Sequence, residues 1–353
     1  MTKQVVCRYI KIGGGEPVSI QSMTNTDTRD TEASLAQIKR LEEAGCEIVR
    51  LAVPDREAAE SFARIRKRTD LPLVCDIHFD HELAIAAIKA GADKVRINPG
   101  NIGDAERVRK VVTEAKAAGI PIRIGVNSGS LEKDLLASYG HVCAEALCES
   151  AMRNVRLVED MGFDDIVISI KSSDVRMTVD SYRKLSEMTD HPLHIGVTEA
   201  GTPEAGKIKS AVGLGALLLD DIGDTLRVSL TADPVEEVFA AQKILAAAGK
   251  IVMPIEIVSC PTCGRTEVDL VSLAVEAERQ LYAVGKKRLS EGKRNLKVAV
   301  MGCAVNGPGE AAEADFGVAC GKGKGVLFRD GKPFMTVSEE EIVPSLVRMA
   351  EEI

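Results

Sequence analysis

Between residues 18 and 248 the chain alternates short runs of apolar and β-branched residues with longer segments whose apolar residues recur at helical spacing. This alternation is typical of βαβ units and a parallel sheet. Eight strands are predicted: Val18–Met23, Ile48–Val53, Leu73–His78, Lys94–Pro99, Ile122–Asn127, Ile166–Lys171, His194–Ala200 and Leu226–Leu230. Eight such units indicate a closed (β/α)8 barrel, and an open doubly wound sheet is the alternative.

The segments between these strands carry the helical spacing. Among the predicted helices are Thr31–Ala44, His81–Ala90, Ala105–Ala118, Ala144–Met161 and Val235–Ala248. Glycine follows each of these five helices, as Gly45, Gly91, Gly119, Gly162 and Gly249. Glycine favours helix ends because it adopts the left-handed conformation of a C-cap without strain.

Successive strand residues point to opposite faces, and here the two faces differ in polarity. One parity is apolar and is expected to pack on the outer helices. The other carries Arg50, Asp76, His78, Arg96, Asn98, Arg123, Asn127, Ser169, Lys171, Glu199, Arg227 and Ser229. This polar parity is predicted to line the barrel interior and its C-terminal mouth, where barrel enzymes keep their active sites.

Five of these interior positions are cations, namely Arg50, Arg96, Arg123, Lys171 and Arg227. Unpaired buried charges are costly, so the cations need anions. An ion-pair network with Asp76 and Glu199 is one interpretation, but two carboxylates do not balance five cations. A ligand with two or more phosphates would, and Arg suits bidentate phosphate contacts. Glu199 is the predicted acid/base residue at the mouth, and His78 is interpreted as a satisfied interior histidine.

After Gly249 the pattern changes to that of a small α+β domain, so the predicted domains are residues 1–249 and 250–353. Its predicted elements are a strand at Ile251–Val258, a helix at Glu267–Val284, a strand at Leu296–Val300, a hairpin at Gly317–Val337 turning at Arg329–Lys332, and a last helix from Ser338. Ser338 with Glu341 three residues on predicts a capping box. The basic stretch Gly321–Gly325 is either a solvated turn or a contact for an acidic electron donor.

Two cysteine motifs follow the first two strands of this domain. One is Ser-Cys-Pro-Thr-Cys-Gly-Arg at 259–265, and the other is Met-Gly-Cys-Ala-Val-Asn-Gly-Pro-Gly-Glu at 301–310. Three thiols, Cys260, Cys263 and Cys303, can converge there with the carboxylate of Glu310. The pattern fits an iron–sulfur cluster held by thiolates. A structural zinc site that also uses Cys320, and a thioredoxin-like redox pair, are the alternatives.

Composition narrows the range of partners. Lys and Arg total 45 against 53 acidic residues, a net charge of −8, which argues against nucleic acid or an anionic membrane as the main partner. The N-terminus has no apolar stretch typical of a signal peptide, so a cytoplasmic protein is expected. Nine cysteines without export signals do not indicate a disulfide framework. Outside the motifs, Cys7, Cys46, Cys75, Cys143 and Cys148 are interpreted as structural, and the role of Cys320 stays open.

The two cysteine loops resemble those of the bacterial 4-hydroxy-3-methylbut-2-enyl diphosphate synthase family. The barrel segments that are similar to the same family are Ile97–Asn101, Gly125–Ser130, Ile170–Ser173, Gly196–Gly201 and Gly223–Ser229. The resemblance therefore runs over the whole chain. It implies a two-domain protein, in which a (β/α)8 barrel is followed by a domain similar to a module of sulfite and nitrite reductases.

The resemblance also implies chemistry. Cys260, Cys263, Cys303 and Glu310 would ligate a [4Fe-4S] cluster, with Glu199 and Glu310 as catalytic residues. The implied substrate is 2-C-methyl-D-erythritol 2,4-cyclodiphosphate, bound by the five cations with Asn98, Asn127, Ser229 and Asn306. Reductive ring opening with loss of water would give 4-hydroxy-3-methylbut-2-enyl diphosphate, with ferredoxin or flavodoxin as electron donor. The alternatives are a redox-inactive barrel enzyme with a structural zinc domain, and an iron–sulfur carrier or sensor.

A head-to-tail homodimer with shared active sites is also expected. The helix 235–248 runs back along the barrel for roughly 20 Å, so Gly249 emerges at the face opposite the mouth. About ten residues, at most roughly 35 Å of extended chain, then lead to Cys260. A two-fold dimer lets each cluster domain cap the partner's barrel, and the resemblance implies the same arrangement. A monomer whose linker folds back is the alternative.

Overall fold

The computed structural model describes residues 1–353 except 78, 304–310 and 312. The predictions made for His78, Asn306 and Glu310 therefore lie outside the described residues. The chain divides into two compact units, Met1–Ile251 and Val252–Ile353, and each is described by itself. Within the described residues, none of the helices has the length and apolar character that crossing a bilayer requires.

The first unit is built on eight strands in one sheet. They are β3 (Ser19–Met23), β4 (Ile48–Ala52), β5 (Leu73–Asp76), β6 (Lys94–Ile97), β7 (Ile122–Asn127), β8 (Ile166–Lys171), β9 (His194–Ile195) and β10 (Thr225–Leu226). Their order is β8-β7-β6-β5-β4-β3-β10-β9, and the neighbours pair in parallel. A parallel bridge between Ile168 and Leu193 joins the two ends of this order. The predicted eight-stranded barrel is confirmed, and the open-sheet alternative is wrong.

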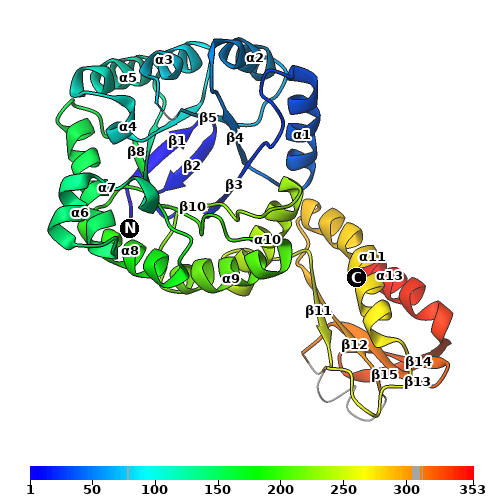
Figure 1. The fold of residues 1–353 in the computed structure, drawn as a ribbon. Coiled ribbons are helices and arrows are strands. Elements are labelled where there is room, and N and C mark those ends of the chain that lie inside the picture. Colours follow the sequence, from blue (N-terminus) through cyan, green and yellow to red (C-terminus); the bar gives the residue numbers. More distant parts are fainter. Residues whose placement is uncertain (78, 304–310, 312) are drawn as a thin grey trace. The chain divides into compact units, whose positions relative to one another are not determined.

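Helices form a ring around these strands (Figure 1). They are α1 (Thr31–Glu43), α2 (Arg56–Arg66), α3 (His81–Lys89), α4 (Pro99–Ile102), α5 (Ala105–Ala118), α6 (Lys133–Tyr139), α7 (Ala144–Glu159), α8 (Val175–Met188), α9 (Pro203–Leu219) and α10 (Pro234–Ala247), with a 3-10 turn η1 (Ser128–Ser130). The apolar parity of the strands packs against them in one continuous core. The five glycines predicted to end helices all have φ between +65° and +95°.

An N-terminal hairpin, which the sequence analysis missed, covers one end of the barrel. Strands β1 (Gln4–Cys7) and β2 (Ile10–Gly13) pair antiparallel, and Figure 1 shows them inside the outline of the ring. Buried residues of the hairpin pack against Ile48, Val74 and Val167, which lie at the starts of β4, β5 and β8. The N-terminal end of the barrel is therefore filled with apolar side chains, and the polar interior opens at the other end.

The second unit is a five-stranded sheet with two long helices. Its elements are β11 (Ile255–Ser259), α11 (Leu270–Ser290), β12 (Leu296–Met301), β13 (Phe316–Gly321), β14 (Lys324–Arg329), β15 (Lys332–Ser338), a 3-10 turn η2 (Glu339–Glu341) and α13 (Ile342–Glu352). The strands follow chain order; β11, β12 and β13 are parallel and the last three are antiparallel. Residues of α11 and α13, such as Leu281 and Leu346, form a core with Val298 and Phe316.

Of the local features predicted for the second unit, the hairpin turn is confirmed and the helix start and the capping box are not. Asp330 and Gly331 have φ of 49° and 72°, as a two-residue hairpin turn requires, so the predicted turn is confirmed. The helix predicted from Glu267 begins later, because the Asp269 carboxylate accepts a hydrogen bond from the Ser272 amide and caps it there. Ser338 precedes η2 and makes no side-chain capping bond, so the predicted capping box is wrong.

Candidate active site

The polar side chains that alternate along the strands converge inside the barrel. Arg96 lies opposite Asp76 on one side and Arg123 on the other, because β5, β6 and β7 pair in register. The side chains of Arg50, Arg96 and Arg123 are buried, and Lys171 and Arg227 are half-buried. Gly125, two residues after Arg123, leaves room for this crowding, since a Cβ there would lie 2.6 Å from Nε of Arg96.

A cavity of about 90 Å³ lies beside three of these cations, while Arg96 and Arg123 are not among its lining residues. Its lining includes Arg50, Lys171, Arg227 and Ser229 of the predicted site, together with Ser169, Tyr182, His194, Gly196 and Thr198. Apart from Tyr182 of α8, these residues come from four different strands or the loops that follow them. The structure thus brings together four of the predicted substrate-binding residues around one space.

Asp76 is the carboxylate that two of the arginines share. Its Oδ1 lies 3.0 Å from Nη1 of Arg96, and its Oδ2 lies 3.5 Å from Nε of Arg50. Burial alone would raise the pKa of Asp76, but the charges of Arg50 and Arg96 hold it well below its usual range. Asn127 completes this group, because its Oδ1 accepts a hydrogen bond of 3.4 Å from Arg96.

The other interior carboxylate is Glu237, which the sequence analysis missed. Both oxygens of Glu237 accept hydrogen bonds from Arg227, at 3.1 and 3.0 Å, and Oε2 also accepts one from Ser22. Glu237 lies in the first turn of α10, a helix predicted to lie outside the barrel. That helix follows β10 closely, so its first turn is near the strand's C-terminal end. The short connection between β10 and α10 was therefore the sequence feature that could have indicated Glu237.

Glu199 lies beyond the end of the strand that was predicted to carry it. Strand β9 ends at Ile195, and Glu199 is exposed in the turn beyond it with φ of +51°. A non-glycine residue in this region carries backbone strain, which is frequent at functional sites. Ion pairing by Glu199 belonged to the alternative interpretation of a structural network; Arg227 instead pairs with Glu237. A catalytic role for Glu199 stays a prediction.

Among the described residues, two of the predicted interior cations, Arg123 and Lys171, form no ion pair with a carboxylate. Within the described residues, Arg123 is fully buried and none of its guanidinium nitrogens has a hydrogen-bond partner. Burial, and then the charges of Arg50 and Arg96, lower the pKa of Arg123 well below its usual range. Burial, and then the charges of Arg96 and Arg50, likewise lower the pKa of Lys171 to about 6.

Lys94 is a sixth interior cation that the sequence analysis overlooked. It is fully buried, and its Nζ lacks a hydrogen-bond partner among the described residues. Burial lowers its pKa to about 8. Lys94 precedes Arg96 by two residues, so the strand parity that identified Arg96 could have found it. Even without the two lysines, the four interior arginines outnumber the two carboxylates, Asp76 and Glu237, so the described interior has a positive excess.

The barrel is splayed beside the cavity. Among the described residues, β8 and the segment leading into β9 share one bridge, between Ile168 and Leu193, and beyond it the hydroxyl of Tyr182 lies between the strands. This hydroxyl accepts a hydrogen bond from the Ile170 amide at 2.9 Å and lies 2.6 Å from the His194 carbonyl, to which it donates. The two segments join again where the Thr198 amide donates to the Ser172 carbonyl at 3.1 Å. A phenol between two strands holds them apart at the position where Lys171 and His194 line the cavity.

Asn98 has a different local role from the other predicted site residues. Its side-chain oxygen accepts a hydrogen bond of 3.1 Å from the Gly100 amide and caps the short helix α4. Asn98 is 6% exposed. Because its side-chain oxygen is used in the cap, its amide nitrogen is the donor that remains for a ligand.

The cysteine loops meet at one edge of the second unit's sheet. Strands β11 and β12 are adjacent and parallel, with Ser259 opposite Val300, so Cys260 and Cys303 follow neighbouring strand ends. The Gly302 amide donates a hydrogen bond of 3.3 Å to Sγ of Cys260. Thr266 fixes the loop around Cys263 through bonds of 3.1 and 3.0 Å with its backbone.

The donor set at this edge fits a thiolate-held iron–sulfur cluster. Cys260 and Cys303 are half-buried and Cys263 is exposed, so the thiols are accessible. The amide of Arg265 lowers the pKa of Cys263, and N–H donors to sulfur are typical of cluster loops. Cys320, the additional ligand of the zinc alternative, is fully buried in the core instead, where burial raises its pKa to about 12.

Comparison with protein families covers both units. Residues 2–242 match the GcpE TIM-barrel domain, and residues 256–352 match the GcpE protein C-terminal domain. This chain belongs to the GcpE family. Within this family it is 54% identical over 353 residues to the 4-hydroxy-3-methylbut-2-en-1-yl diphosphate synthase (flavodoxin) of Caldanaerobacter subterraneus subsp. tengcongensis, covering 100% of the chain and 97% of the relative. The synthase of the same name from Clostridium acetobutylicum is 55% identical over 347 residues, covering 98% and 97%.

Solved structures with a similar fold are more distant from this GcpE family member. Dihydropteroate synthase from Stenotrophomonas maltophilia matches with a TM-score of 0.51 and 18% identity, covering 70% of the chain and 98% of that structure. The Yersinia pestis dihydropteroate synthase gives a TM-score of 0.51 at 13% identity, covering 71% and 100%. At such identities the likeness concerns the barrel fold alone.

Proposed function

We propose that this chain is an iron–sulfur oxidoreductase that converts 2-C-methyl-D-erythritol 2,4-cyclodiphosphate to 4-hydroxy-3-methylbut-2-en-1-yl diphosphate. The family relatives that carry this synthase name match nearly the whole chain at more than half identity. The comparisons give no support to a redox-inactive barrel enzyme with a structural zinc domain. The proposal thus assigns the barrel to the substrate and the second unit to electron transfer.

The observation that carries the proposal is the excess of buried cations in the barrel. Arg123 and Lys171 have no anionic partner among the described residues, and Asp76 is shared between Arg50 and Arg96. A cyclic diphosphate supplies two negative phosphates that can neutralise this excess, and arginine suits such contacts. Asn98, Asn127, Ser229 and Asn306 complete the proposed binding set as hydrogen-bonding groups.

The proposed cofactor is a [4Fe-4S] cluster held by Cys260, Cys263, Cys303 and Glu310. When bound, such a cluster supplies electrons one at a time at low potential. Reduction of the cyclodiphosphate takes two electrons: the ring C–O bond breaks, a hydroxyl leaves as water after taking a proton, and a carbon–carbon double bond forms. The relatives' name supports a flavodoxin as the electron donor.

The chain's own residues then have distinct tasks. Arg50, Arg123 and Lys171 hold the phosphates and stabilise the negative charge that develops on the opening ring oxygen. Asp76 orients Arg50 and Arg96 through its two oxygens. Glu199, exposed beyond β9, is the proposed proton donor to the leaving hydroxyl, because a carboxyl group there can exchange protons with solvent.

A head-to-tail homodimer with shared active sites is part of the proposal. Helix α10 leads the chain from the mouth to the opposite end of the barrel, where Ile251 still packs on the barrel core. Only the segment Val252–Ser259, largely strand β11, then precedes Cys260. A two-fold assembly in which each second unit serves the partner's barrel makes both contacts by one symmetry operation.

The cofactor assignment is tested by anaerobic purification. A brown protein with iron and acid-labile sulfide, in amounts near four of each per chain, is expected for a [4Fe-4S] cluster. Replacing Glu310 with Ala should change the EPR spectrum of the reduced protein while the three cysteines keep the iron. A colourless protein that contains zinc would contradict the assignment.

A further inference from the structure

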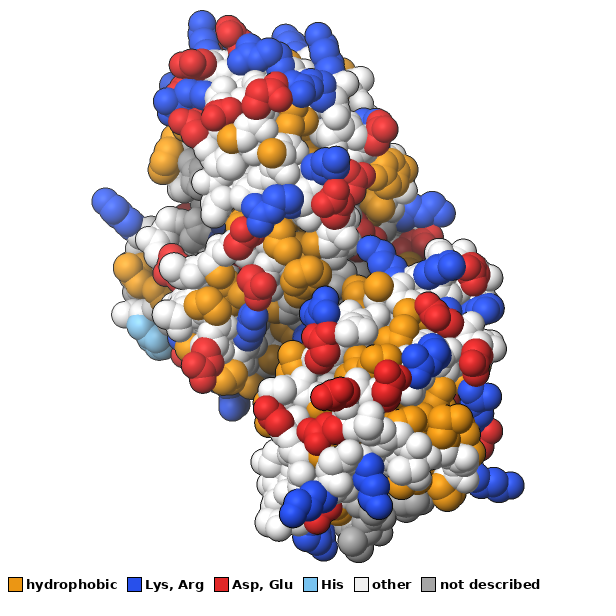
Figure 2. Space-filling model, turned by 90° about the vertical axis from the view of Figure 1, so that its right-hand side faces the viewer, with side chains coloured by type: hydrophobic (Ala, Val, Ile, Leu, Met, Phe, Trp, Pro, Cys, Tyr) orange, Lys and Arg blue, Asp and Glu red, His pale blue; other side chains and the backbone are white. Residues whose placement is uncertain are grey.

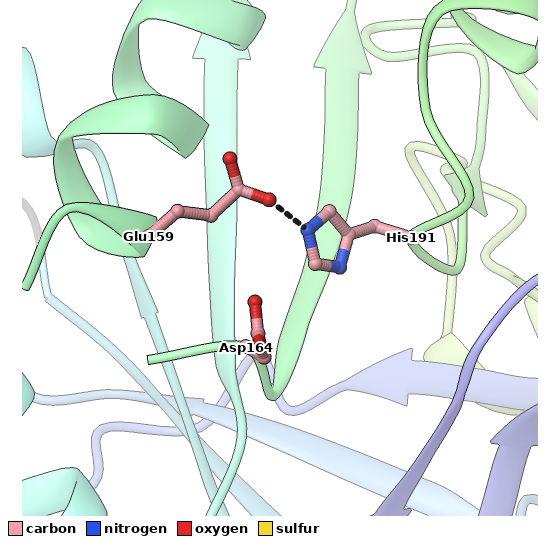
Figure 3. A group of neighbouring side chains, drawn as sticks. All are labelled: Glu159, Asp164 and His191. Carbon is pink, nitrogen blue, oxygen red and sulfur yellow. Dashed lines mark hydrogen bonds and ion pairs between the residues drawn. The ribbon is translucent and has the colours of Figure 1, made fainter. Parts of the chain in front are cut away.

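A group of potential metal ligands lies at the end of the barrel where β8 and β9 begin. Glu159 is the last residue of α7, Asp164 lies in the loop before β8, and His191 lies in the loop before β9 (Figure 3). One ligand atom from each of the three lies within 4.8 Å of the other two. Nε2 of His191 is 2.9 Å from Oε1 of Glu159. These residues belong to neither the cavity nor the cysteine loops.

The histidine ring is buried more deeply than one hydrogen bond explains. The side chain of His191 is 1% exposed, whereas that of Glu159 is 35% exposed. Nδ1 of His191 is buried and has no hydrogen-bond partner among the described residues. Leaving a ring nitrogen unsatisfied costs free energy, and a bond to one half-exposed carboxylate offsets little of it. A stronger bond at Nε2, such as one to a metal ion, would account for this burial.

The charges around the ring also point to a cation. Asp164 approaches the same ring as Glu159 in Figure 3, and its carboxylate makes no hydrogen bond or ion pair among the described residues. Two carboxylates this close repel one another unless a positive charge lies between them.

We propose that Glu159, Asp164 and His191 bind one divalent transition-metal ion, with water completing its coordination. One imidazole nitrogen and two carboxylates suit Mn²⁺ or Zn²⁺, whereas Ca²⁺ and Mg²⁺ prefer oxygen ligands alone. The half-exposed Glu159 and exposed Asp164 give the ion an entry path from solvent.

The position of the site indicates a structural role at the barrel seam. At the starts of β8 and β9 the two segments are joined at Ile168, whose amide donates to the Pro192 carbonyl at 2.9 Å, before Tyr182 separates the strands. Glu159 and Asp164 precede β8, and His191 precedes β9. A shared ion would therefore tie the starts of both strands together and strengthen the contact that closes the barrel.

The test titrates Mn²⁺ into the anaerobically purified full-length protein with its cluster intact, and follows free Mn²⁺ by EPR. Thiolates are poor ligands for Mn²⁺, so the cysteine loops do not compete for it. We expect one Mn²⁺ per chain, and at least about tenfold weaker binding after Asp164→Asn or His191→Gln, since losing even an outer-shell partner costs about that much. Asp160→Asn is the matched control, because it removes the same charge from an exposed neighbour.

Hydrogen exchange then tests whether the bound ion stabilises the starts of β8 and β9. Mn²⁺ should slow exchange of the Ile168 amide in the parent protein and leave it unchanged in the Asp164→Asn variant. Equal Mn²⁺ affinity in Asp164→Asn and Asp160→Asn, or no binding by the parent at millimolar Mn²⁺, would overturn the proposal. Because Asp164 is exposed, its variant keeps the test valid even if His191→Gln fails to fold.

Discussion

Two arginines in the barrel unit, Arg66 at 9% exposed and Arg123 at 0%, differ in what surrounds their charge. Arg66 donates to Asp93 at 2.6 Å and to backbone carbonyls, so its charge is neutralised within the fold. Arg123 has no partner among the described residues. A buried cation without an anion lowers the stability of the folded chain. An anionic ligand bound in the barrel, as proposed above, would offset this cost.

Replacing Arg123 with Met should separate binding from stability. We expect affinity for the cyclodiphosphate to fall about ten- to a hundredfold, since one charge-assisted contact contributes roughly 1.5–3 kcal/mol. The free energy of unfolding should stay equal or rise, because an unpaired charge is removed. Calorimetric titration and urea unfolding measure the two quantities.

The matched control for that experiment is Arg66→Met. It breaks a buried ion pair and should lower stability by about 3 kcal/mol while leaving affinity unchanged. If instead Arg123→Met loses stability as Arg66→Met does and still binds the ligand normally, Arg123 serves the fold.

Lys171 should make substrate binding depend on pH. Its pKa of about 6 in the free protein leaves it mostly neutral at pH 7.5, and bound phosphates would raise that pKa by favouring the charged form. Binding then takes up a proton, so affinity should fall as pH rises from about 6 until the pKa of the complex is passed. Calorimetry at pH 7.5 in two buffers of different ionisation enthalpy should show uptake of nearly one proton, and Lys171→Met should abolish it. A parent protein that binds without proton uptake would refute this view of Lys171.

Residue-scale signals predicted part of this site. Strand parity identified Arg50, Arg96 and Arg123 because alternation places them on one face whatever the exact strand ends. It misplaced Glu199, because β9 ends early and the turn beyond it no longer follows that alternation. Glu237 reaches Arg227 through a helix end, and no periodicity within one element reveals such a contact.

At the scale of elements, the seam between β8 and β9 depends on one phenol. Replacing Tyr182 with Phe removes the hydroxyl that pairs with both the Ile170 amide and the His194 carbonyl. We expect a loss of about 1–3 kcal/mol in unfolding free energy, because buried backbone groups lose their partner. The Ile170 amide should also exchange faster with deuterium.

Tyr139→Phe is the control for this change. The hydroxyl of Tyr139 donates to Glu149 at 2.8 Å in a half-buried position, so its removal should cost less than about 1 kcal/mol. Equal losses in the two variants would mean that the seam has no special dependence on Tyr182.

The elements themselves were largely predictable from the sequence. Helix ends were marked by glycine, and long strands such as β7 and β8 matched their predicted bounds, because both signals are local. The hairpin of β1 and β2 was missed because its short strands are stabilised by packing on Ile48, Val74 and Val167, which are distant in the chain. Strands β9 and β10 are short for a similar reason, since the seam and the cavity interrupt their pairing.

At the scale of the whole molecule, the net charge of −8 contrasts with a barrel interior in which cations exceed carboxylates. Such focusing of positive charge in an acidic protein favours small anionic ligands over anionic polymers or membranes. The proposed division of labour, with the barrel for the substrate and the second unit for electrons, follows from where the cations and the cysteines lie.

Shared active sites predict complementation between inactive chains. Arg123→Ala should weaken substrate binding about ten- to a hundredfold and Cys303→Ala should abolish the cluster, so at substrate concentrations well below the parental KM each variant alone has little or no activity. After subunit exchange about half of the dimers are mixed, each with one intact composite site, so roughly a quarter of parental activity should return. No recovery despite demonstrated exchange would mean that each site is built within one chain.

The most direct test of the central claim is anaerobic turnover of 2-C-methyl-D-erythritol 2,4-cyclodiphosphate by the cluster-loaded protein with a chemical reductant. Mass spectrometry and NMR identify the product. The account predicts 4-hydroxy-3-methylbut-2-en-1-yl diphosphate, two electrons consumed per molecule formed, no turnover by Cys303→Ser, and at least about tenfold slower turnover by Arg123→Met at substrate concentrations well below the parental KM. Unchanged cyclodiphosphate with an intact reduced cluster, or product formation by the Cys303→Ser protein, would contradict it.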